Sequence, residues 1–256
     1  MPRFAANLSM LWPELATVPE RIGAAARAGF DAAEILFVHD LGLAELRDSL
    51  DEHGVRLVLF DADPGNWAAG ERGLLCGPDE SRFRRSVERA ASDAAFLGVG
   101  WVNLLAGVPE SIPSETALDL CRERLQWAAA SYGGSELGFL VEAINPLDMP
   151  GYALSTPDAA AALVEDVAHS RVRLQFDAYH AGMVGRDPRE VLAAQRPLIG
   201  HVQVADVPGR HEPGTGRLDL IGLLSDLDAS GYDGWVGCEY QPTRATEETL
   251  EWMRRT

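Results

Sequence analysis

The chain has 256 residues, of which 46% are hydrophobic, and it carries 39 acidic against 22 basic side chains, which gives a net charge of −17 at pH 7. This length suits one enzyme-sized domain with a large core, so we expect residues 1–256 to form a single domain. The acidic balance argues against nucleic-acid binding, and without an apolar stretch of roughly 18 residues or a secretory N-terminus we expect a cytoplasmic protein without membrane contact.

Apolar runs typical of buried strands alternate with amphipathic or alanine-rich helical patterns along the whole chain. The strand-like runs lie near residues 4–9, 33–37, 56–60, 101–105, 138–142, 172–177, 199–205 and 235–239. The helical patterns lie near residues 17–29, 43–53, 79–98, 114–131, 156–168, 188–195, 218–230 and 244–254. Eight of each is the number found in a (β/α)₈ TIM barrel, so we predict this α/β fold class.

An open, doubly wound sheet is the other architecture that alternating strands and helices allow. Such sheets usually carry a glycine-rich phosphate loop early in the chain, and neither G-x-G-x-x-G nor a P-loop follows the first run. The segment Ser155-Thr156-Pro157 is typical of a helix start, and Gly54 of a helix end. No linker rich in serine or glycine interrupts the alternation, which favours the barrel.

Four of the strand-like runs end in a carboxylate or amide side chain, those of Glu142, Asp177, Gln203 and Glu239. In a parallel barrel such strand ends converge at one mouth. Four oxygen ligands without cysteine suit Mg²⁺ or Mn²⁺ better than structural zinc. Taken singly, each acid is explained equally well as a helix N-cap or a solvated loop charge. Repetition at four strand ends favours a divalent-metal site.

The basic residues and the cysteines narrow the chemistry further. All 22 basic residues are arginine, and the absence of lysine excludes Schiff-base aldolases and pyridoxal-phosphate enzymes, which need its amine. An anionic substrate must then be held by arginine, histidine, backbone N–H groups or the metal. Cys76, Cys121 and Cys238 are odd in number and far apart, which indicates reduced thiols rather than a disulfide framework.

Seven segments stand in order along nearly the whole chain: Phe4–Leu11, Gly65–Gly73, Glu142–Pro146, Pro150–Tyr152, Gln175–His180, Gly200–Gly216 and Tyr232–Tyr240. Together they closely resemble the hydroxypyruvate isomerase family. Its wider group, the xylose isomerase-like barrels, also holds ketose 3-epimerases and endonuclease IV-type enzymes. The resemblance implies a (β/α)₈ barrel whose site lies at the C-terminal ends of the strands, where the four strand-end residues also point.

The resemblance also implies the chemistry of the site. Glu142, Asp177, Gln203 and Glu239 would hold a divalent metal ion, Mg²⁺ or Mn²⁺, and Glu142 and Glu239 would be the catalytic acid and base. The reaction would move a carbonyl between adjacent carbons, as in hydroxypyruvate and 2-hydroxy-3-oxopropanoate, through a cis-enediolate stabilised by the metal. A 2-oxo-tetronate isomerase and a ketose 3-epimerase on the same scaffold are the alternatives.

Three carboxylates and one divalent cation leave about one negative charge, so a carboxylate substrate needs further positive groups. The candidates for substrate contact are His180, Arg210, His211, Arg72 and Trp67. Arg210 is favoured because barrels often place anion-binding groups in the loop after strand seven. For Arg72 a surface ion pair with Glu71 is the alternative, and for Trp67 a role as the apolar anchor of a lid. We expect His201 to pack deeper in the barrel.

Two positions depart from the pattern of the family that the chain resembles. Asp61 stands where relatives commonly have asparagine, and Ala143 replaces the proline that usually follows the first glutamate. An extra acid near the site disfavours an anionic substrate unless it points away. Asp148 has a structural and a functional explanation of equal weight.

Two other classes of protein fit the sequence less well. A DNA-repair endonuclease would need a basic surface and a histidine-rich metal cluster, and a non-catalytic sugar-acid binding protein would not need both glutamates. The expected partner is therefore a small-molecule substrate. Monomer and homo-oligomer are both open.

Overall fold

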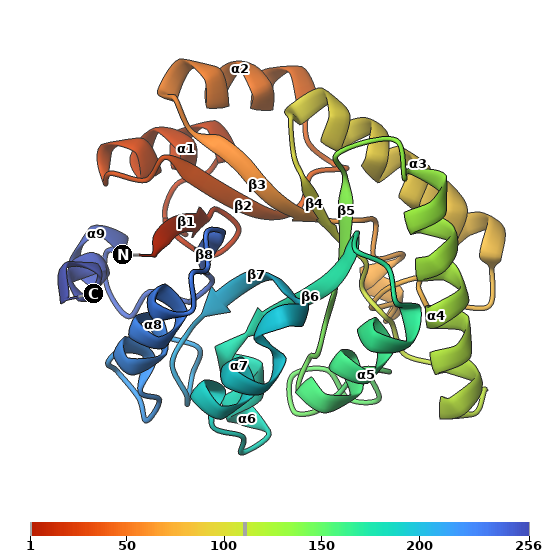
Figure 1. Cartoon of the computed structure of the whole chain (residues 1–256). Helices are drawn as coiled ribbons and strands as arrows, with labels where there is room; N and C mark the ends of the chain where they lie inside the picture. Colours follow the sequence, from red (N-terminus) through yellow and green to blue (C-terminus); the bar gives the residue numbers. More distant parts are fainter. Residues whose placement is uncertain (1, 110–111, 256) are drawn as a thin grey trace.

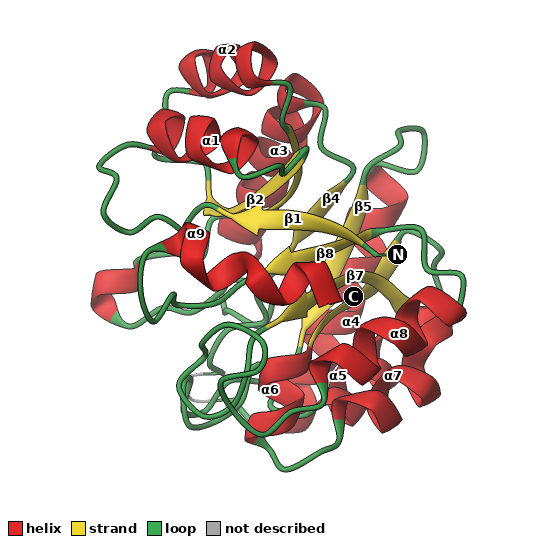
Figure 2. Ribbon diagram, turned by 90° about the vertical axis from the view of Figure 1, so that its left-hand side faces the viewer, coloured by secondary structure: helices red, strands yellow, loops and turns green. Residues whose placement is uncertain are grey.

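Eight parallel strands close into one barrel in the computed structural model, which describes residues 2–109 and 112–255 (Figure 1). The strands follow one another in chain order, and β8 pairs back onto β1, for example Ala5 with Gly237. The predicted TIM-barrel fold class is confirmed. Helices surround the strands on the outside, as the side view in Figure 2 shows.

The strands are β1 (Arg3–Asn7), β2 (Ala32–Phe37), β3 (Arg56–Asp61), β4 (Trp101–Asn103), β5 (Gly138–Glu142), β6 (Val172–Asp177), β7 (Ile199–Val204) and β8 (Trp235–Cys238). The α-helices are α1 (Val18–Arg27), α2 (Leu43–His53), α3 (Glu80–Leu97), α4 (Ser114–Ser131), α5 (Pro157–Val167), α6 (Ala178–Met183), α7 (Pro188–Gln195), α8 (Leu220–Ala229) and α9 (Thr246–Thr249). Short 3₁₀ segments are η1 (Trp67–Ala69), η2 (Arg196–Leu198) and η3 (Leu250–Arg255).

Burial explains why these residues form these elements. All five residues of β5 are buried, as expected for a parallel strand covered on one face by helices and on the other by the barrel interior. The covering helices are amphipathic: α3 turns Phe83, Val87, Ala90 and Ala94 inward, at the spacing of one helical face. The apolar side chains therefore form one core between the strands and the helical layer.

The expected strands and helices agree with the structure to within two residues, apart from the last helix. Thr156 caps α5 with its side chain, and Gly54 ends α2 in a left-handed conformation, as predicted. The expected helix at 244–254 is a single α-helical turn followed by η3. The α6 helix was missed because its six residues are too few to show a periodicity.

A layer of polar side chains crosses the barrel interior beneath the strand ends. The carboxylate of Glu34 in β2 lies 2.8 Å from Nε2 of His201 and accepts hydrogen bonds from Nδ2 of Asn7 and Nε2 of Gln203, both at 3.0 Å. Since β1 and β8 separate β2 from β7, the contacts with His201 and Gln203 run through the interior. Glu34 is 1% exposed, so its carboxyl group depends on the hydrogen bonds of this layer rather than on water.

Two further findings concern the sequence predictions. Cys76, Cys121 and Cys238 are all buried with free thiols, in line with the expected reduced state. Among the helices of residues 2–109 and 112–255, no helix has the length and apolar character that crossing a membrane requires.

Gly237 of β8 provides the space that the buried Glu34 carboxylate occupies, since a Cβ at this position would collide with both carboxylate oxygens. We expect Gly237→Ala to lower the free energy of unfolding by about 1–3 kcal/mol, the usual cost of overpacking a core. Urea denaturation measures this loss. Gly100→Ala is the matched control, because a Cβ there meets nothing within 4 Å and the residue is exposed. Equal effects of the two substitutions would contradict this account.

Candidate functional site

Three buried acids meet at the end of the barrel where the strands finish. Glu142 is the last residue of β5, Asp177 is the last residue of β6, and Glu239 directly follows β8. Each is at most 5% exposed. Asp177 also caps α6, because its Oδ1 accepts a hydrogen bond from the backbone N–H of Tyr179 at 2.8 Å. Asp177 is therefore a helix cap, one of the two explanations considered from the sequence, and it also lies with the other acids at the strand ends.

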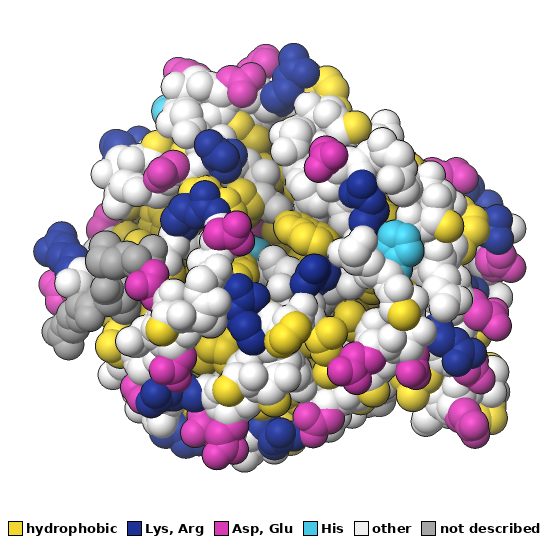
Figure 3. All heavy atoms as spheres, viewed as in Figure 1, with side chains coloured by type: hydrophobic (Ala, Val, Ile, Leu, Met, Phe, Trp, Pro, Cys, Tyr) yellow, Lys and Arg dark blue, Asp and Glu magenta, His cyan; other side chains and the backbone are white. Residues whose placement is uncertain are grey.

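A pocket of about 220 Å³ opens at these acids. Its polar lining consists of Asp61, Glu142, Asp148, Glu239, His180 and Arg210, and apolar side chains such as Phe37, Trp67 and Ile144 complete it. The volume lies below the roughly 300–1,000 Å³ of sites for drug-sized ligands, so the pocket suits a small metabolite. On the face of the molecule drawn in Figure 3, acidic and basic side chains are interspersed around hydrophobic ones.

Arg210 provides the positive charge next to these acids. Its Nη2 lies 2.7 Å from Oε1 of Glu239 and 3.1 Å from Oδ2 of Asp177, and its guanidinium stands over the ring of Tyr179 at 5.0 Å. Burial alone would lower the pKa of Arg210, but the carboxylates of Glu239 and Asp177 raise it above its ordinary value. The backbone φ is 56°, in the left-handed region that residues other than glycine seldom adopt. A strained backbone conformation is thus retained where it directs this side chain at the acids.

Asp206 builds the loop that carries Arg210, and the sequence analysis missed it. Its fully buried carboxylate accepts hydrogen bonds at 2.8–3.0 Å from four backbone N–H groups, those of Val207, Gly214, Gly216 and Leu218. Four hydrogen bonds to one buried carboxyl group fix the course of the loop. The signal was present in the sequence, where an acid directly follows a strand-like run and precedes a segment rich in glycine and proline.

Asn145 determines which ring nitrogen of His180 carries the hydrogen. The amide has one orientation, because its Oδ1 accepts from the backbone N–H groups of Leu147 and Asp148 and its Nδ2 donates to the Asp148 carboxylate. The same Nδ2 lies 2.8 Å from Nδ1 of His180. Nδ1 is therefore the acceptor, and we assign the hydrogen to Nε2.

The Nε2–H of His180 faces the acids, with Nε2 3.6 Å from Oδ2 of Asp177 and 3.8 Å from Oε1 of Glu142. Burial, assisted by the charge of Arg210, holds the pKa of His180 well below its ordinary value. The imidazole is thus a neutral hydrogen-bond donor at neutral pH.

Burial and mutual repulsion raise the pKa values of the acids. The pKa of Glu142 is raised well above its ordinary value by burial and then by the charges of Glu239 and Asp177. Burial likewise raises the pKa of Glu239, although Arg210 opposes the shift. For Asp177 burial outweighs the opposing effects of Arg210 and the Tyr179 N–H, so its pKa is also raised. Acids crowded in this way favour either shared protons or a bound cation.

The donor set fits a divalent cation. Ligand atoms of Glu142, Asp177 and His180 all lie within 4.8 Å of one another, the group found among the described residues. Carboxylate oxygens are the ligands that Mg²⁺ and Mn²⁺ take. The Nε2 of His180 would first have to lose its hydrogen, so we favour the carboxylates as ligands and His180 as a donor.

Gln203 is the expected ligand whose side chain is already engaged elsewhere. It lies beside Asp177 in the strand register. Its Oε1 accepts a hydrogen bond from Gln175 at 2.7 Å, and its Nε2 donates to Glu34. An amide oxygen has a second lone pair, so one further bond to Oε1 is compatible with this arrangement.

Trp67 and Arg72, which belong to the loop considered as a lid, differ in their relation to the pocket. Trp67 lines the pocket and packs 5.7 Å from the ring of Phe37, and the Arg72 guanidinium stands over Trp67 at 4.1 Å. Arg72 donates to the backbone carbonyls of Trp67 and Glu71. Glu71 pairs with Arg82 at 2.5 Å rather than with Arg72, so the ion pair considered from the sequence is wrong. Arg72 stiffens this loop without lining the pocket.

His211 and His201 lie apart from the acids at the strand ends. His211 holds the chain after β8, because its Nδ1 lies 2.8 Å from the carbonyl oxygen of Gln241, and it does not line the pocket. His201 packs deeper, in the interior layer with Glu34, as expected.

Asp61, the last residue of β3, is a fourth acid at the strand ends and is turned into the pocket. Its Oδ1 accepts a hydrogen bond from Nδ2 of Asn103 at 3.0 Å, and the same nitrogen lies 3.5 Å from Oε2 of Glu142. Burial raises the pKa of Asp61 to about 8, with Asn103 and Arg210 opposing the shift and Glu34 adding to it. This carboxyl group therefore holds a proton at neutral pH.

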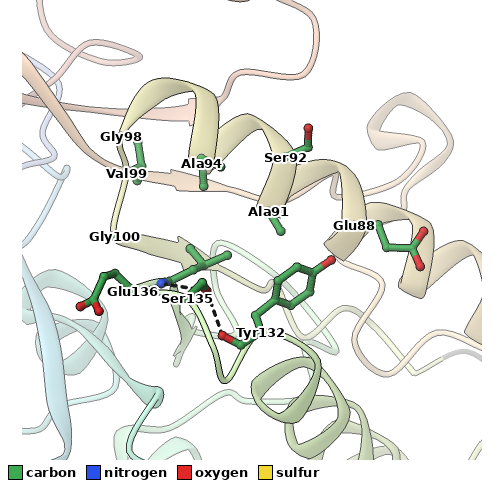
Figure 4. A pocket seen from close by; sticks show the side chains of 12 residues that line it. Glu88, Ala91, Ser92, Ala94, Gly98, Val99, Gly100, Tyr132, Ser135 and Glu136 are labelled. Atoms are coloured by element: carbon green, nitrogen blue, oxygen red, sulfur yellow. Dashed lines mark hydrogen bonds between the residues drawn. The ribbon is translucent and has the colours of Figure 1, made fainter.

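A second hollow, of about 570 Å³, lies between α3 and the segment that follows α4 (Figure 4). It is lined mainly by apolar side chains, and its titratable residues are Glu88, Tyr132 and Glu136. Gly100 and Leu137, which line it, precede β4 and β5, so the hollow lies at the N-terminal ends of the strands. TIM barrels place catalysis at the opposite end. The pocket with the acids is therefore the candidate active site.

Comparisons with known proteins agree with the fold. A family model described as a xylose isomerase-like TIM barrel matches residues 22–256. A 2-oxo-tetronate isomerase from Cupriavidus necator is 42% identical, over 99% of this chain and 98% of that protein. A hydroxypyruvate isomerase from Escherichia coli is 37% identical, over 99% and 98%. A crystal structure titled AP endonuclease, family 2, from Brucella melitensis is 37% identical, with a TM-score of 0.96 over 100% and 99% of the two chains.

The raised pKa of Asp61 predicts a pH dependence of stability. A carboxyl with a pKa of about 8 in the folded protein and about 3.9 in the unfolded chain binds a proton on folding, so the free energy of unfolding falls as the pH rises from about 5 to 8. Asparagine does not titrate. The stability of Asp61→Asn relative to the unsubstituted protein should therefore increase over this range, by up to about 4 kcal/mol at 1.36 kcal/mol per pH unit.

Urea denaturation of metal-free protein at pH 5, 6, 7 and 8 tests this prediction. Asp51→Asn, an exposed acid in α2, is the control and should show no trend. A stability difference between Asp61→Asn and the unsubstituted protein that is constant with pH would show that Asp61 is ionised throughout.

Proposed function

The chain belongs to the hydroxypyruvate isomerase family within the xylose isomerase-like TIM barrels, and on this premise we propose that it interconverts a small hydroxy-oxo acid and its carbonyl isomer. Hydroxypyruvate and 2-hydroxy-3-oxopropanoate are one such pair. The chain is an isomerase, as its full-length relatives are. The observation that carries the finer assignment is the placing of Glu142 and Glu239 on two sides of one buried pocket, with Asp177 and Arg210 between them in strand order.

The reaction requires one carboxylate to remove a proton from the carbon that bears the hydroxyl, and a second group to return a proton to the neighbouring carbon. Glu142 and Glu239 are the pair in this proposal. Both have pKa values raised by burial, and raising the pKa of a carboxyl group makes its carboxylate a stronger base toward the proton of the substrate. No external oxidant or reductant is needed, because the hydrogen stays within the substrate and the exchanging acids.

We assign Glu142, Asp177, Glu239 and Gln203 as the residues that would hold Mg²⁺ or Mn²⁺. When bound, such a cation supplies electrostatic stabilisation of the negative charge that develops on the substrate oxygens. Arg210, which stays charged within the pocket, is assigned to the carboxylate of the substrate. The Nε2–H of His180 is the neutral donor beside it, and Trp67 closes the apolar side.

Metal removal tests the role of the cation. Protein stripped of metal with a chelator should lose the isomerisation of hydroxypyruvate, 2-oxo-tetronate and related acids, and adding back Mg²⁺ or Mn²⁺ should restore it. A coupled assay or NMR of the products measures the conversion. Full activity after rigorous metal removal would contradict the metal assignment. If metal-loaded protein converts neither these acids nor uncharged ketoses, the isomerisation proposed here is wrong.

Substitution of the two glutamates tests the proton transfer. Glu142→Gln and Glu239→Gln keep an oxygen and the shape but remove the base, so kcat should fall by about 10² to 10⁴. Metal content is measured for each variant, because loss of the cation would also reduce the rate. Glu52→Gln, an exposed residue of α2, is the control. A glutamine variant that keeps its metal and the control's rate would remove that glutamate from the mechanism.

A further inference from the structure

The pocket has two unlike ends. In a closed barrel of eight strands, β3 and β7 are diametrically opposite. Asp61 ends β3, and Arg210 lies in the loop that follows β7. Both line the same pocket. A small molecule within it therefore meets a guanidinium on one side and a carboxyl group on the other.

The side chain of Asp61 is held in place by a neighbouring residue in the barrel wall. Asn103 in β4 is fully buried, and its Nδ2 reaches both Asp61 and Glu142. Its Oδ1 is buried without a hydrogen-bond partner among the described residues, so the Asp61 and Asn103 pair has hydrogen-bonding capacity that the protein does not use.

The chemistry of the two ends orients a hydroxy-oxo acid. Its carboxylate is attracted to the positive charge of Arg210 and finds no positive charge at Asp61. A hydroxyl group, in contrast, both donates and accepts hydrogen bonds and so pairs with a carboxyl group in either protonation state. With its pKa raised to about 8, Asp61 carries a hydrogen at neutral pH and has a donor to offer as well.

The length of the substrate decides whether a hydroxyl reaches Asp61. In a three-carbon hydroxy-oxo acid the carboxylate, the carbonyl and the hydroxyl are all taken up by Arg210 and the reacting pair of carbons. A four-carbon acid has one more hydroxyl, on the carbon beyond that pair. Without such a group, the Asp61 carboxyl group has no substrate hydroxyl to pair with in the pocket, which is costly for a buried hydrogen-bonding group.

We infer that Asp61, positioned by Asn103, is a specificity-determining residue that hydrogen-bonds a neutral hydroxyl one carbon beyond the reacting pair. The isomerase accordingly prefers four-carbon hydroxy-oxo acids that carry this hydroxyl over three-carbon acids. The inference rests on the proposed function. It adds that the substrate carries a further hydroxyl group, which is recognised by a residue at the end of β3.

The test compares two substrates that differ only in the spectator hydroxyl. Metal-loaded enzyme is assayed with 2-oxo-tetronate and with its 4-deoxy analogue, 3-hydroxy-2-oxobutanoate, and kcat/KM is measured for each. We expect kcat/KM to be about 10- to 100-fold higher for the substrate with the hydroxyl, the effect of leaving one buried hydrogen-bonding group unpaired. Equal values would overturn the inference while leaving the isomerase proposal intact. Conversion of neither acid would instead count against the proposed function.

Variants assign the preference to Asp61. Asp61→Leu removes the hydrogen-bonding group, so the ratio of the two kcat/KM values should fall toward one, whereas Asp61→Asn keeps a donor and an acceptor and should retain the preference. Asp61→Ala serves the same purpose as Asp61→Leu should leucine prevent folding. Asp51→Asn on the exposed face of α2 is the control and should keep the ratio of the unsubstituted enzyme. A preference that survives in Asp61→Leu or Asp61→Ala would show that the hydroxyl is recognised elsewhere.

Discussion

Crowding of buried carboxyl groups at the mouth of the barrel is the constraint on which the rest of the structure depends. Asp61, Glu142, Asp177 and Glu239 are all at most 6% exposed, and burial raises the pKa of each. These four acids would be better solvated in water than in the protein interior, so holding them together requires a rigid scaffold. Parallel strands provide it, because each acid stands at or next to a strand end that is fixed on both sides by backbone hydrogen bonds.

The residues around the acids also hold them in place, first by direct contact and then through the residues behind that contact. Arg210 compensates Asp177 and Glu239 directly, and Asp206 fixes the loop that brings Arg210 there. Asn145 sets the hydrogen of His180 toward the acids. Beneath them, the Glu34 layer holds Gln203 in a defined orientation. A site that moves protons between carbons needs its groups within fractions of an ångström of their working positions, and hydrogen-bond networks of this kind hold them there.

The sequence revealed the barrel and its strand-end residues because a parallel strand buried on both faces is a short, mainly apolar run, here with an acid or amide at or near its end. That rule located Glu142, Asp177 and Gln203 without a structure; their assignment to metal and proton transfer stays a prediction. The rule did not reveal which residues their side chains contact. The partner of Gln203 is Glu34, 169 residues away, and no local pattern indicates that contact. Asp61 was visible as a departure from the family, but only the closed barrel shows that it faces Arg210 across the pocket. The α6 helix, which carries His180, is too short for its periodicity to be read.

The central claim is that hydrogen moves between the two carbons as a proton carried by buried carboxyl groups, rather than as a hydride passed directly from carbon to carbon. Conversion of the substrate in D₂O, followed by mass spectrometry and NMR of the product, distinguishes the two. Because a carboxyl group exchanges its proton with solvent between turnovers, the account predicts about one deuterium per product molecule at the carbon that receives the proton. A product that has formed fully and carries no deuterium at that carbon would contradict it.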